Sequence, residues 1–462
     1  MAQPGPSLSR GILFARCLAF AVLTAGTFLL SPVVAALTPS YSEIEGYITV
    51  VRPDSFYVSE TRIAITRGTQ YQFMGDHAPS AADPTSKSIM VGAYVKVTGD
   101  VDRPGGITTA AVILFRDETV RKLSGLGVID RVVSAGAEPV YQADGYRIRI
   151  TAATKTSFTG DLKTLQDVGP NSWIHYVGIR GRDGVLVASK AQFIPAKPTA
   201  FKALKGLEVR DVKFELPPSS PPSGASNSKG QSANDVLDQE AALPEDGGRV
   251  LLGSTWHNIS TDRALQSRVR RIGARLVPAY QKRFPADHSS KIHFRFYAVD
   301  AQKIRSESCA LDGLIFVPVQ VIERLKNDDQ LAAVLADGIG TNLQRQAARL
   351  VADERKLLGN AIAGDIAGAL VPGLGLVAVP GAIAGQDIET EMEEQRGRVA
   401  LSLMADAGYD PRQAPEAWRL LAPKKLPSNP DTLTYPSISG YQLSILKLQY
   451  TMADNAATER SK

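Results

Sequence analysis

Apolar and polar residues alternate in short runs along residues 41–197. Examples are Gly46-Tyr-Ile-Thr-Val-Val51, Arg62-Ile-Ala-Ile-Thr66 and Ala93-Tyr-Val-Lys-Val-Thr-Gly99, with glycine, proline and aspartate between the runs. Alternation with a period of two places successive side chains on opposite faces of a sheet, and the intervening residues favour turns. The pattern therefore predicts an all-β region over this part of the chain.

The all-β region contains two copies of one pattern. One copy opens at Ile44-Glu-Gly-Tyr-Ile-Thr-Val-Val51 and the other at Gly125-Leu-Gly-Val-Ile-Asp-Arg-Val-Val133. A unit of about 75–80 residues with some five strands suits a small closed barrel. We expect two OB-like barrels, at 40–118 and 122–198, which resemble small barrel domains of unknown function in exported bacterial proteins.

The composition changes between residues 214 and 248. The run Leu216-Pro-Pro-Ser-Ser-Pro-Pro-Ser-Gly-Ala-Ser-Asn-Ser-Lys-Gly230 is rich in proline, serine and glycine. Such a segment cannot bury a core, because it has too little apolar surface to offset the entropy of ordering it. We expect a disordered linker at 214–248, which separates the barrels from a last domain at 249–455.

Helical spacing of apolar residues begins after the linker. A helix is expected over Asp262–Pro278, and a second begins at Asp328, whose carboxylate favours the positive end of the helix dipole. Two apolar runs between these helices, at 291–299 and 313–319, are typical of strands. A third helix is expected over Ile388–Ala407. The last domain is therefore predicted to be α+β and mostly helical.

Residues 359–385 are rich in glycine and alanine and contain two prolines. These helix breakers argue against a straight transmembrane helix, which needs about 20 consecutive apolar residues. Two interpretations stay open. The composition favours a buried hairpin, and the alternative is a segment that makes peripheral contact with a membrane.

The first 36 residues have the pattern of a secretory signal peptide. Arg10 and Arg16 precede an uncharged, mostly apolar run, and Val34-Ala-Ala36 offers the small residues that signal peptidase requires. We expect export to the periplasm or the extracellular space, with cleavage near Ala36. An uncleaved membrane anchor is the alternative, because the run approaches the length of about 20 residues that spans a bilayer.

The charge of the exported chain does not indicate a nucleic-acid partner. Loss of residues 1–36 would lower the formal charge from +5 to +3, because this segment carries two arginines and no acidic residue. The strands also lack the interleaved basic and aromatic residues on which bases would stack. Cys309 would be the only cysteine left, so no disulfide could form within the mature chain.

Four segments of the last domain resemble segments of the M-48 zinc metalloendopeptidases, the group of HtpX, the CAAX prenyl proteases and the BepA-type assembly proteases. They are Ile292-His-Phe-Arg-Phe-Tyr297, Leu314-Ile-Phe-Val-Pro318, Asp329-Gln-Leu-Ala-Ala-Val-Leu335 and Ala407-Gly-Tyr-Asp-Pro-Arg412. With their order and spacing, the resemblance extends over residues 262–448. It implies a zincin-like fold of the gluzincin type.

The zinc-binding motif of that family is not retained. In H-E-x-x-H, two histidines one helical turn apart hold zinc, and the glutamate acts as the general base. The resemblance places these three positions on Asp337, Gly338 and Thr341. The third zinc ligand of the family, a glutamate, falls on Glu393, and a further histidine of the family falls on Tyr435.

The alignment of the third ligand has an alternative. A gap of two residues would move it from Glu393 to Glu391, and the aspartate that follows it in the family would fall on Gln395 rather than Gly397. In either alignment the ligand position keeps a carboxylate. Asp337 and this glutamate are hard oxygen ligands, which suit Ca²⁺ or Mg²⁺ better than a tetrahedral zinc site.

Loss of the motif removes two contributions to hydrolysis. Gly338 has no side chain that could accept a proton from water, and general-base catalysis is typically worth about 10²- to 10⁴-fold. Activation of the water by a metal would be lost as well. We therefore expect a catalytically inactive pseudopeptidase with no resident cofactor.

The leading hypothesis is an exported pseudopeptidase that binds a protein or peptide partner in the cell envelope. Peptidase clefts of this class bind an extended chain beside an edge strand. The candidate strand consists of Leu314, Ile315, Phe316 and Val317. Two alternatives stay open: an active metal-dependent endopeptidase, with zinc held by unorthodox ligands such as His293, and a glycan- or nucleic-acid-binding protein that acts through the barrels.

Overall fold

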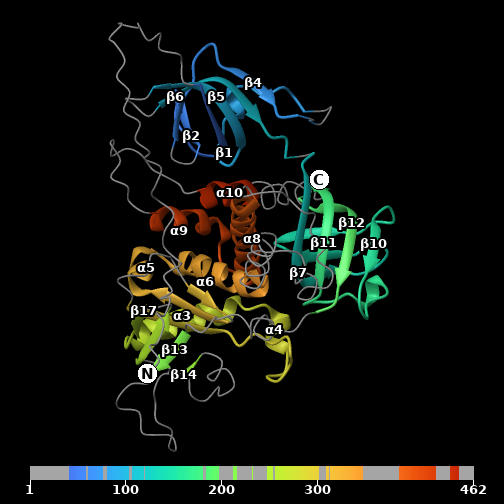
Figure 1. The fold of residues 1–462 in the computed structure, drawn as a ribbon, viewed down its shortest axis with the longest axis vertical. Helices are drawn as coiled ribbons and strands as arrows, with labels where there is room; N and C mark the ends of the chain where they lie inside the picture. Colours follow the sequence, from blue (N-terminus) through green and yellow to red (C-terminus); the bar gives the residue numbers. More distant parts are fainter. Residues whose placement is uncertain are drawn as a thin grey trace, which may run out of the picture. The chain divides into compact units, whose positions relative to one another are not determined.

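A computed structural model gives the fold of the chain (Figure 1). It describes residues 41–58, 61–75, 77, 81–102, 107–118, 120–180, 184–196, 212–215, 231–232, 247–252, 255–300, 309–311, 313–346, 384–422 and 437–446. These residues form an all-β region followed by a part that combines a sheet with helices. The order of fold types that the hydrophobic pattern predicts is confirmed. The predicted signal peptide and residues 359–383 lie outside the described residues.

The first barrel is built from strands β1 to β6. Five of them pair in the order β3-β2-β1-β5-β6, and a parallel pairing of β3 with β6 closes the ring. β4 pairs in parallel with the C-terminal half of β6. The bounds are β1 Tyr41–Val51, β2 Ser55–Val58, β3 Thr61–Ala64, β4 Gln70–Phe73, β5 Tyr94–Asp102 and β6 Ile107–Phe115, with a 3-10 helix at Ser86–Ser88.

The second barrel repeats the pairing of the first. Its strands follow the order β9-β8-β7-β11-β12, a parallel pairing of β9 with β12 closes the ring, and β10 pairs in parallel with β12. The bounds are β7 Lys122–Ser134, β8 Val140–Ala143, β9 Tyr146–Arg149, β10 Lys155–Phe158, β11 Trp173–Arg180 and β12 Leu186–Ile194, with a 3-10 helix at Leu165–Asp167. This order, with one parallel closure, is compatible with the OB-fold. The predicted repeat is confirmed at the level of topology.

A glycine marks the same bulge in both barrels. Gly99 in β5 and Gly178 in β11 lie where the register with the next strand shifts. A Cβ atom at Gly99 would come within 2.0 Å of the Thr109 carbonyl oxygen, and one at Gly178 within 2.4 Å of the Val187 carbonyl oxygen. Only glycine allows the neighbouring strand to approach this closely. The repeat therefore includes the individual residues that bend the strands.

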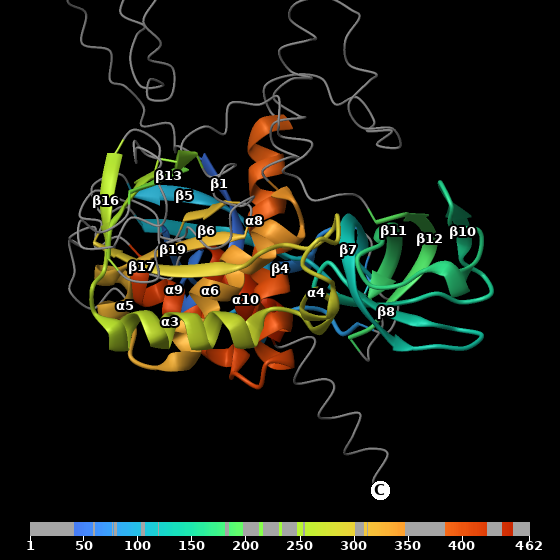
Figure 2. The same cartoon turned by 90° about the horizontal axis from the view of Figure 1, so that it is seen from below.

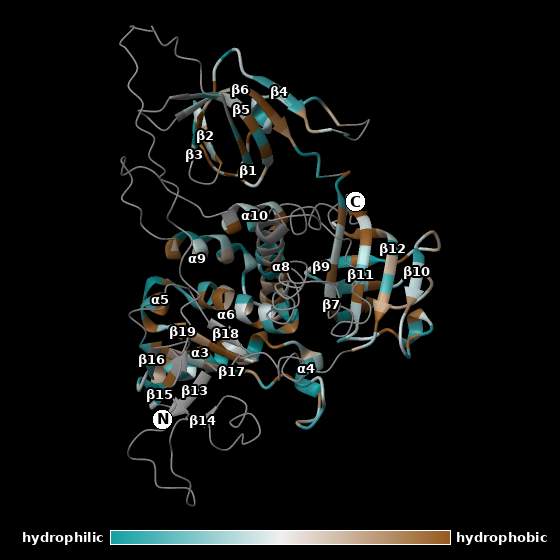
Figure 3. Ribbon diagram, in the orientation of Figure 1, coloured by the Kyte–Doolittle hydropathy of each residue, from teal (hydrophilic) through white to brown (hydrophobic). Residues whose placement is uncertain are grey.

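Each barrel encloses apolar side chains from alternate strand positions. Hydrophobic and hydrophilic residues alternate visibly along β11 and β12 (Figure 3). The first barrel has a core cluster of its own, whereas the buried residues of the second barrel are continuous with the core of the helical part. Fully buried examples are Ile48, Phe56, Ile63, Val97 and Ile113 in the first barrel, and Ile129, Ile148, Ile174 and Phe193 in the second.

A third sheet is formed by strands that lie before and between the first helices in the sequence. Its seven strands follow the order β14-β13-β15-β16-β17-β19-β18, in which β17 and β19 are parallel neighbours. The bounds are β13 Val212–Glu215, β14 Gln231–Ser232, β15 Arg249–Leu252, β16 Thr255–Ile259, β17 Arg295–Asp300, β18 Cys309–Leu311 and β19 Leu314–Pro318. The strands predicted at 291–299 and 313–319 correspond to β17 and β19.

The expectation of a disordered linker at 214–248 is wrong in part. β13 ends at Glu215, and β14 lies within the predicted linker and pairs with β13. β13 pairs in turn with β15. Pairing at the edge of a sheet uses backbone hydrogen bonds, which require no apolar side chain.

The expectation that Leu314–Val317 forms an edge strand is wrong. β17 pairs with this segment on one side, and β18 pairs with residues 314–316 on the other. A partner chain cannot pair with a strand whose two edges are already occupied. All four side chains are buried. A strand that is apolar at every position is typical of the interior of a sheet rather than its edge.

Helices pack on this sheet and on one another. α3 runs alongside β17 (Figure 2), and α6 contacts α3, α8 and α9. The bounds are α3 Arg263–Leu276, α4 Ala279–Arg283, α5 Val319–Arg324, α6 Asp328–Leu343, α8 Ala384–Asp406, α9 Ala414–Leu421 and α10 Ser437–Leu446, with a 3-10 helix at Pro411–Gln413. The predicted helices correspond to α3, α6 and α8. Within the described ranges, no helix has the length and apolar character needed to cross a membrane.

Candidate functional site at the α6–α8 helix pair

The start of α6 is fixed by polar contacts. The side chain of Asn327 accepts a hydrogen bond from the backbone N–H of Gln330 over 2.8 Å and caps the helix. Asp328 forms ion pairs with Arg268 over 2.8 Å and with Arg271 over 3.0 Å, both on α3. These contacts orient α6 against α3, and the positions expected to form the site lie further along the same helix.

The middle of α6 is buried on all sides. Every residue from Leu331 to Ala336 is inaccessible to solvent. This burial offsets the destabilising effect of Gly338 and Gly340, since each glycine in a helix interior costs about 1 kcal/mol relative to alanine. A Cβ atom at Gly340 would lie 3.2 Å from Cγ1 of Val399, so the glycine allows α8 to approach closely. Packing against the neighbouring elements therefore holds this helix.

An ion pair lies where the resemblance places the first zinc ligand. Oδ2 of Asp337 on α6 is 3.6 Å from Nε of Arg396 on α8. Gly338 is buried, and its carbonyl accepts a hydrogen bond from Asn342 over 2.9 Å. The hydroxyl of Thr341 donates to the carbonyl of Asp337 over 3.0 Å. Gly338 and Thr341 therefore form hydrogen bonds within α6, whereas Asp337 faces the guanidinium of Arg396.

Glutamine side chains join α8 to the residues that follow α6. The side-chain amide of Gln346 donates to the carbonyl of Met392 over 2.9 Å and to Oε1 of Gln395 over 3.0 Å. Of the two alternative ligand positions, Glu391 is exposed and Glu393 is half-buried. Tyr435 lies outside the described residues, and His293 lies beside β17, where it lines a separate groove.

The side chains at this place do not match the donor set of a zinc site. A structural or catalytic zinc site takes mainly nitrogen and sulfur ligands, whereas the expected positions offer one carboxylate, a hydrogen atom and an engaged hydroxyl. The guanidinium of Arg396 would repel a divalent cation bound to Asp337. Within the described ranges, no three histidine, cysteine, aspartate or glutamate side chains gather where they could hold a metal ion.

A buried polar network joins the second barrel to α8, and the sequence did not reveal it. Asp144, in the turn between β8 and β9, is fully buried. Its carboxylate accepts hydrogen bonds from Arg398 over 2.7 Å, from Gln395 over 2.7 Å and from Tyr176 over 2.6 Å. Arg398 also donates to the hydroxyl of Tyr441 over 3.1 Å. The network therefore includes α8, α10, the β8–β9 turn and strand β11.

Charge interactions inside this network reinforce one another. Burial by itself would lower the pKa of Arg398, but the Asp144 carboxylate and the surrounding tyrosines raise the pKa well above its usual value. Burial raises the pKa of Tyr176, and the charge of Asp144 raises it further. Arg398 therefore remains a cation, and Tyr176 remains a neutral hydrogen-bond donor. The positive charge of Arg398 balances the negative charge of the buried Asp144 carboxylate.

Two glycines make room for Asp144. A Cβ atom at Gly127 would lie 2.4 Å from the Asp144 Cβ, and one at Gly125 would lie 2.8 Å from its Oδ2. Asp144 and Gly145 have φ angles of 55° and 72°, as a tight Asp-Gly hairpin turn requires. The Asp-Gly pair and the spacing Gly125-Leu-Gly127 are the only local signals of this contact in the sequence.

The first barrel also contacts the helices. The Tyr47 hydroxyl donates to Oε1 of Glu394 over 3.4 Å and accepts a hydrogen bond from Arg116 over 3.0 Å. The ring of Tyr47 packs edge to face on Tyr441, with 5.6 Å between ring centroids. Burial raises the pKa of Glu394, so this glutamate does not belong to a fully solvated helix face. Both barrels therefore contact α8 and α10.

One comparison with known protein families bears on this arrangement. A family model described as a domain of unknown function (DUF5666) matches residues 45–113. The matched segment extends from β1 into β6 and so corresponds to the first barrel.

Proposed function

We propose that this chain is an exported, peptidase-like protein that binds a protein or peptide partner in the cell envelope and does not hydrolyse it. The observation that carries the proposal is the ion pair of Asp337 and Arg396, which occupies the place where the resemblance to M-48 peptidases puts a zinc ligand. A guanidinium held there supplies the positive charge next to the carboxylate, so the two helices are joined without a metal.

The chemistry of the site supports binding rather than catalysis. Gly338 has no group that could take a proton from water, and the Thr341 hydroxyl is engaged with the helix backbone. Metal activation and general-base catalysis are the two main contributions to hydrolysis by zinc peptidases. A scaffold that keeps its packing while losing both groups is suited to holding a chain rather than cutting it.

The edge strand β18 is the place where an extended partner would bind. Among the described strands, β18 pairs with β19 alone and ends the sheet. The backbone N–H of Gly313, in the turn after β18, donates to the side chain of Asn342 on α6 over 2.8 Å. This contact fixes the β18–β19 hairpin against the end of α6. A partner chain that adds to β18 would extend the sheet next to the altered site.

Crosslinking in cells that naturally produce the protein tests the proposal. A photo-reactive amino acid in place of Ala310 on β18 should attach the protein to its partner. The matched control carries the same group in place of Thr156, an exposed residue on β10, the end strand of the second barrel's sheet. Equal crosslinking at both positions would contradict binding at β18.

Metal analysis of the purified chain tests the absence of hydrolysis. We expect no stoichiometric zinc and no cleavage of casein that a chelator abolishes. Stoichiometric zinc together with chelator-sensitive cleavage would overturn the proposal and favour an active endopeptidase with unorthodox ligands.

A further inference from the structure

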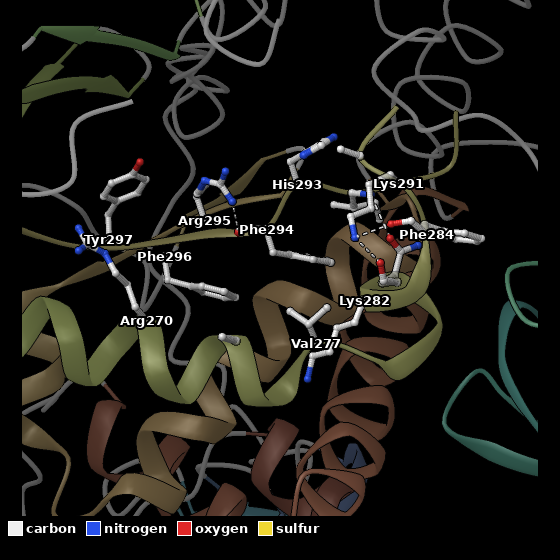
Figure 4. A pocket seen from close by; sticks show the side chains of 14 residues that line it. Arg270, Val277, Lys282, Phe284, Lys291, His293, Phe294, Arg295, Phe296 and Tyr297 are labelled. Carbon is white, nitrogen blue, oxygen red and sulfur yellow. Dashed lines mark hydrogen bonds between the residues drawn. The ribbon is translucent and has the colours of Figure 1, made fainter. Parts of the chain in front are cut away.

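A groove of about 730 Å³ lies beside the first half of β17 (Figure 4). One wall comes from α3 and α4, and the other comes from residues 291–297. The volume is within the range of about 300–1,000 Å³ that is typical of ligand pockets. The groove is separated from β18 by β19, so it is distinct from the site of the proposed function.

The groove adjoins the edge of β17 rather than one of its faces. Its lining includes Phe294 and Phe296, which belong to the core under α3, and also Arg295 and Tyr297, which lie on the opposite face of the strand. Successive side chains of a strand point to opposite faces. A groove lined by residues from both faces of β17 must therefore pass along the edge of this strand. The other edge of β17 is paired with β19.

The neighbouring strand stops before it reaches the groove. β16 pairs with β17 only at Val299 and Asp300. At Ala298 this pairing ends: the backbone N–H of Ser260, the residue after β16, donates to the Ala298 carbonyl over 2.9 Å. The amide of Gln266 also donates to that carbonyl over 2.9 Å and accepts from the Ala298 N–H over 3.2 Å, so a side chain takes the place of a strand residue at this N–H. Within the described ranges, no strand lies against this edge of β17 from Phe294 to Tyr297.

The backbone of Phe296 points into this gap. The N–H of Arg295 donates to the carbonyl of Gly313 over 2.9 Å, on the side of β19. Backbone groups of successive residues in a strand point to opposite edges, so the N–H and carbonyl of Phe296 point toward the groove. They lie two residues before Ala298, at the next place where a neighbouring strand would form hydrogen bonds.

The lining of the groove favours an acidic ligand with apolar groups. Arg270 on α3 and Arg295 on β17 contribute cations on the two walls, with Lys282 and Lys291 near the end formed by α4. None of the described lining residues is acidic. Phe294 and Phe296 stack with 6.3 Å between ring centroids and provide apolar surface between the cations.

We propose that this groove binds an extended acidic peptide segment, which adds to β17 as a short strand. The backbone of Phe296 would form hydrogen bonds with the peptide backbone, and Arg270 and Arg295 would pair with its acidic side chains. Alternate apolar side chains of the peptide would lie on the phenylalanine rings. Backbone pairing gives such a site its affinity, and the side-chain pockets give it specificity.

Binding of labelled peptides to the full-length chain tests this proposal. The probe is a short peptide in which valine and glutamate alternate. One control peptide has lysine in place of glutamate, and another is N-methylated at alternate residues, which removes backbone donors without changing charge. We expect the glutamate peptide to bind at least about tenfold more tightly than either control, because each control loses one of the two interactions.

Variants of the groove locate the binding. Arg270→Glu and Arg295→Glu should each weaken binding of the glutamate peptide at least about tenfold. Ala274→Trp changes an exposed lining residue and should weaken binding by filling the groove without changing charge. Arg263→Glu is the matched control, because it makes the same charge change on α3 at an exposed residue outside the groove. Thermal unfolding checks that each variant is folded.

Three results would overturn the proposal. Equal binding of the N-methylated and unmethylated peptides would exclude strand addition. An unchanged affinity in Ala274→Trp, or the same loss in Arg263→Glu as in Arg270→Glu, would place the binding elsewhere. Tighter binding of dodecanoate than of the glutamate peptide would assign the groove to an acyl anion instead of a peptide.

Discussion

Arg398 on α8 donates from Nη2 to Oδ2 of Asp144 over 2.7 Å, although the two residues are 254 positions apart. Asp144 is completely buried, and Arg398 nearly so. The turn between β8 and β9 is thereby fixed to α8. The charge of each residue is balanced by the other only when the barrel and α8 are in contact. Moving the barrel away from α8 would break this ion pair and the hydrogen bonds that Asp144 accepts from Gln395 and Arg398, so the pair links the barrel to the helices.

Removing the arginine should destabilise the whole chain. Arg398→Met leaves the Asp144 carboxylate buried without its cation, and such a change typically lowers the free energy of unfolding by about 3–5 kcal/mol. Asp144→Asn combined with Arg398→Met should cost clearly less than the sum of the two single changes. Urea denaturation of the four proteins measures the difference.

The matched control for that cycle is the exposed pair of Arg412 and Asp410. Arg412→Met should change the free energy of unfolding little, because solvent screens an exposed ion pair. Strictly additive effects of Asp144→Asn and Arg398→Met would show that the buried pair is not coupled and would contradict this account of the contact.

Gly127 should tolerate no side chain. In Gly127→Ala the new methyl group would lie 2.4 Å from the Cβ of Asp144, so the turn must shift away from α8. Overpacking of this kind typically costs about 1–3 kcal/mol. Gly169→Ala in the same barrel is the control, since nothing lies within 4 Å of its added Cβ atom. Thermal denaturation should separate the two variants, and equal melting temperatures would disprove the steric argument.

The stability of the protein should fall as the pH rises from about 4 to about 8, in part because of Asp130. Burial, with a smaller contribution from the charge of Asp406, raises the pKa of Asp130 to about 8. Neither carboxylate oxygen of Asp130 has a hydrogen-bond partner among the described residues. An unfolded aspartate has a pKa of about 3.9, so in this window the unfolded chain loses a proton that the folded chain keeps. Loss of that proton favours the unfolded state.

Asp130→Asn removes this dependence. We expect the variant to gain stability relative to the unmodified protein as the pH increases, by up to about 1.4 kcal/mol per pH unit within the window. Urea denaturation at about pH 5 and about pH 8 measures the effect. Asp161→Asn, an exposed aspartate of the same barrel, is the control for loss of one carboxylate. Parallel stability curves for Asp130→Asn and the unmodified protein would contradict the prediction.

Local patterns predicted most elements of the fold but little of their pairing. Alternation found the barrel strands, and helical spacing found α3, α6 and α8. The edge of the third sheet was missed because β18 is the three-residue run Cys309–Leu311, too short to show a period. Leu314–Val317 was therefore assigned to an edge that another strand already occupies.

The candidate site shows the same limit. The resemblance to M-48 peptidases implied the positions Asp337, Gly338 and Thr341, which lie on one helix and interact within it or with the adjacent α8. Asp144 could not be found from the sequence, because its partners on α8 are more than 200 residues away along the chain and no local period encodes such a contact. The spacing of Gly125 and Gly127 indicates that another group packs closely against them, but it does not identify that group.

Arg396 should prevent metal binding even when zinc ligands are restored on α6. Asp337→His together with Thr341→His places two imidazoles one helical turn apart, the spacing of a zinc-binding helix. The guanidinium of Arg396, which lies 3.6 Å from the carboxylate of Asp337, would remain beside them and repel Zn²⁺.

Adding Arg396→Ala should therefore increase zinc affinity by at least about tenfold, measured by competition with a chromogenic chelator. Arg412→Ala, which removes an exposed arginine that pairs with Asp410, is the control for the change in net charge. If the double-histidine variant bound zinc equally well with and without Arg396, the arginine would not occupy the place of a metal, and the interpretation of the helix pair as an altered peptidase site would lose its main support.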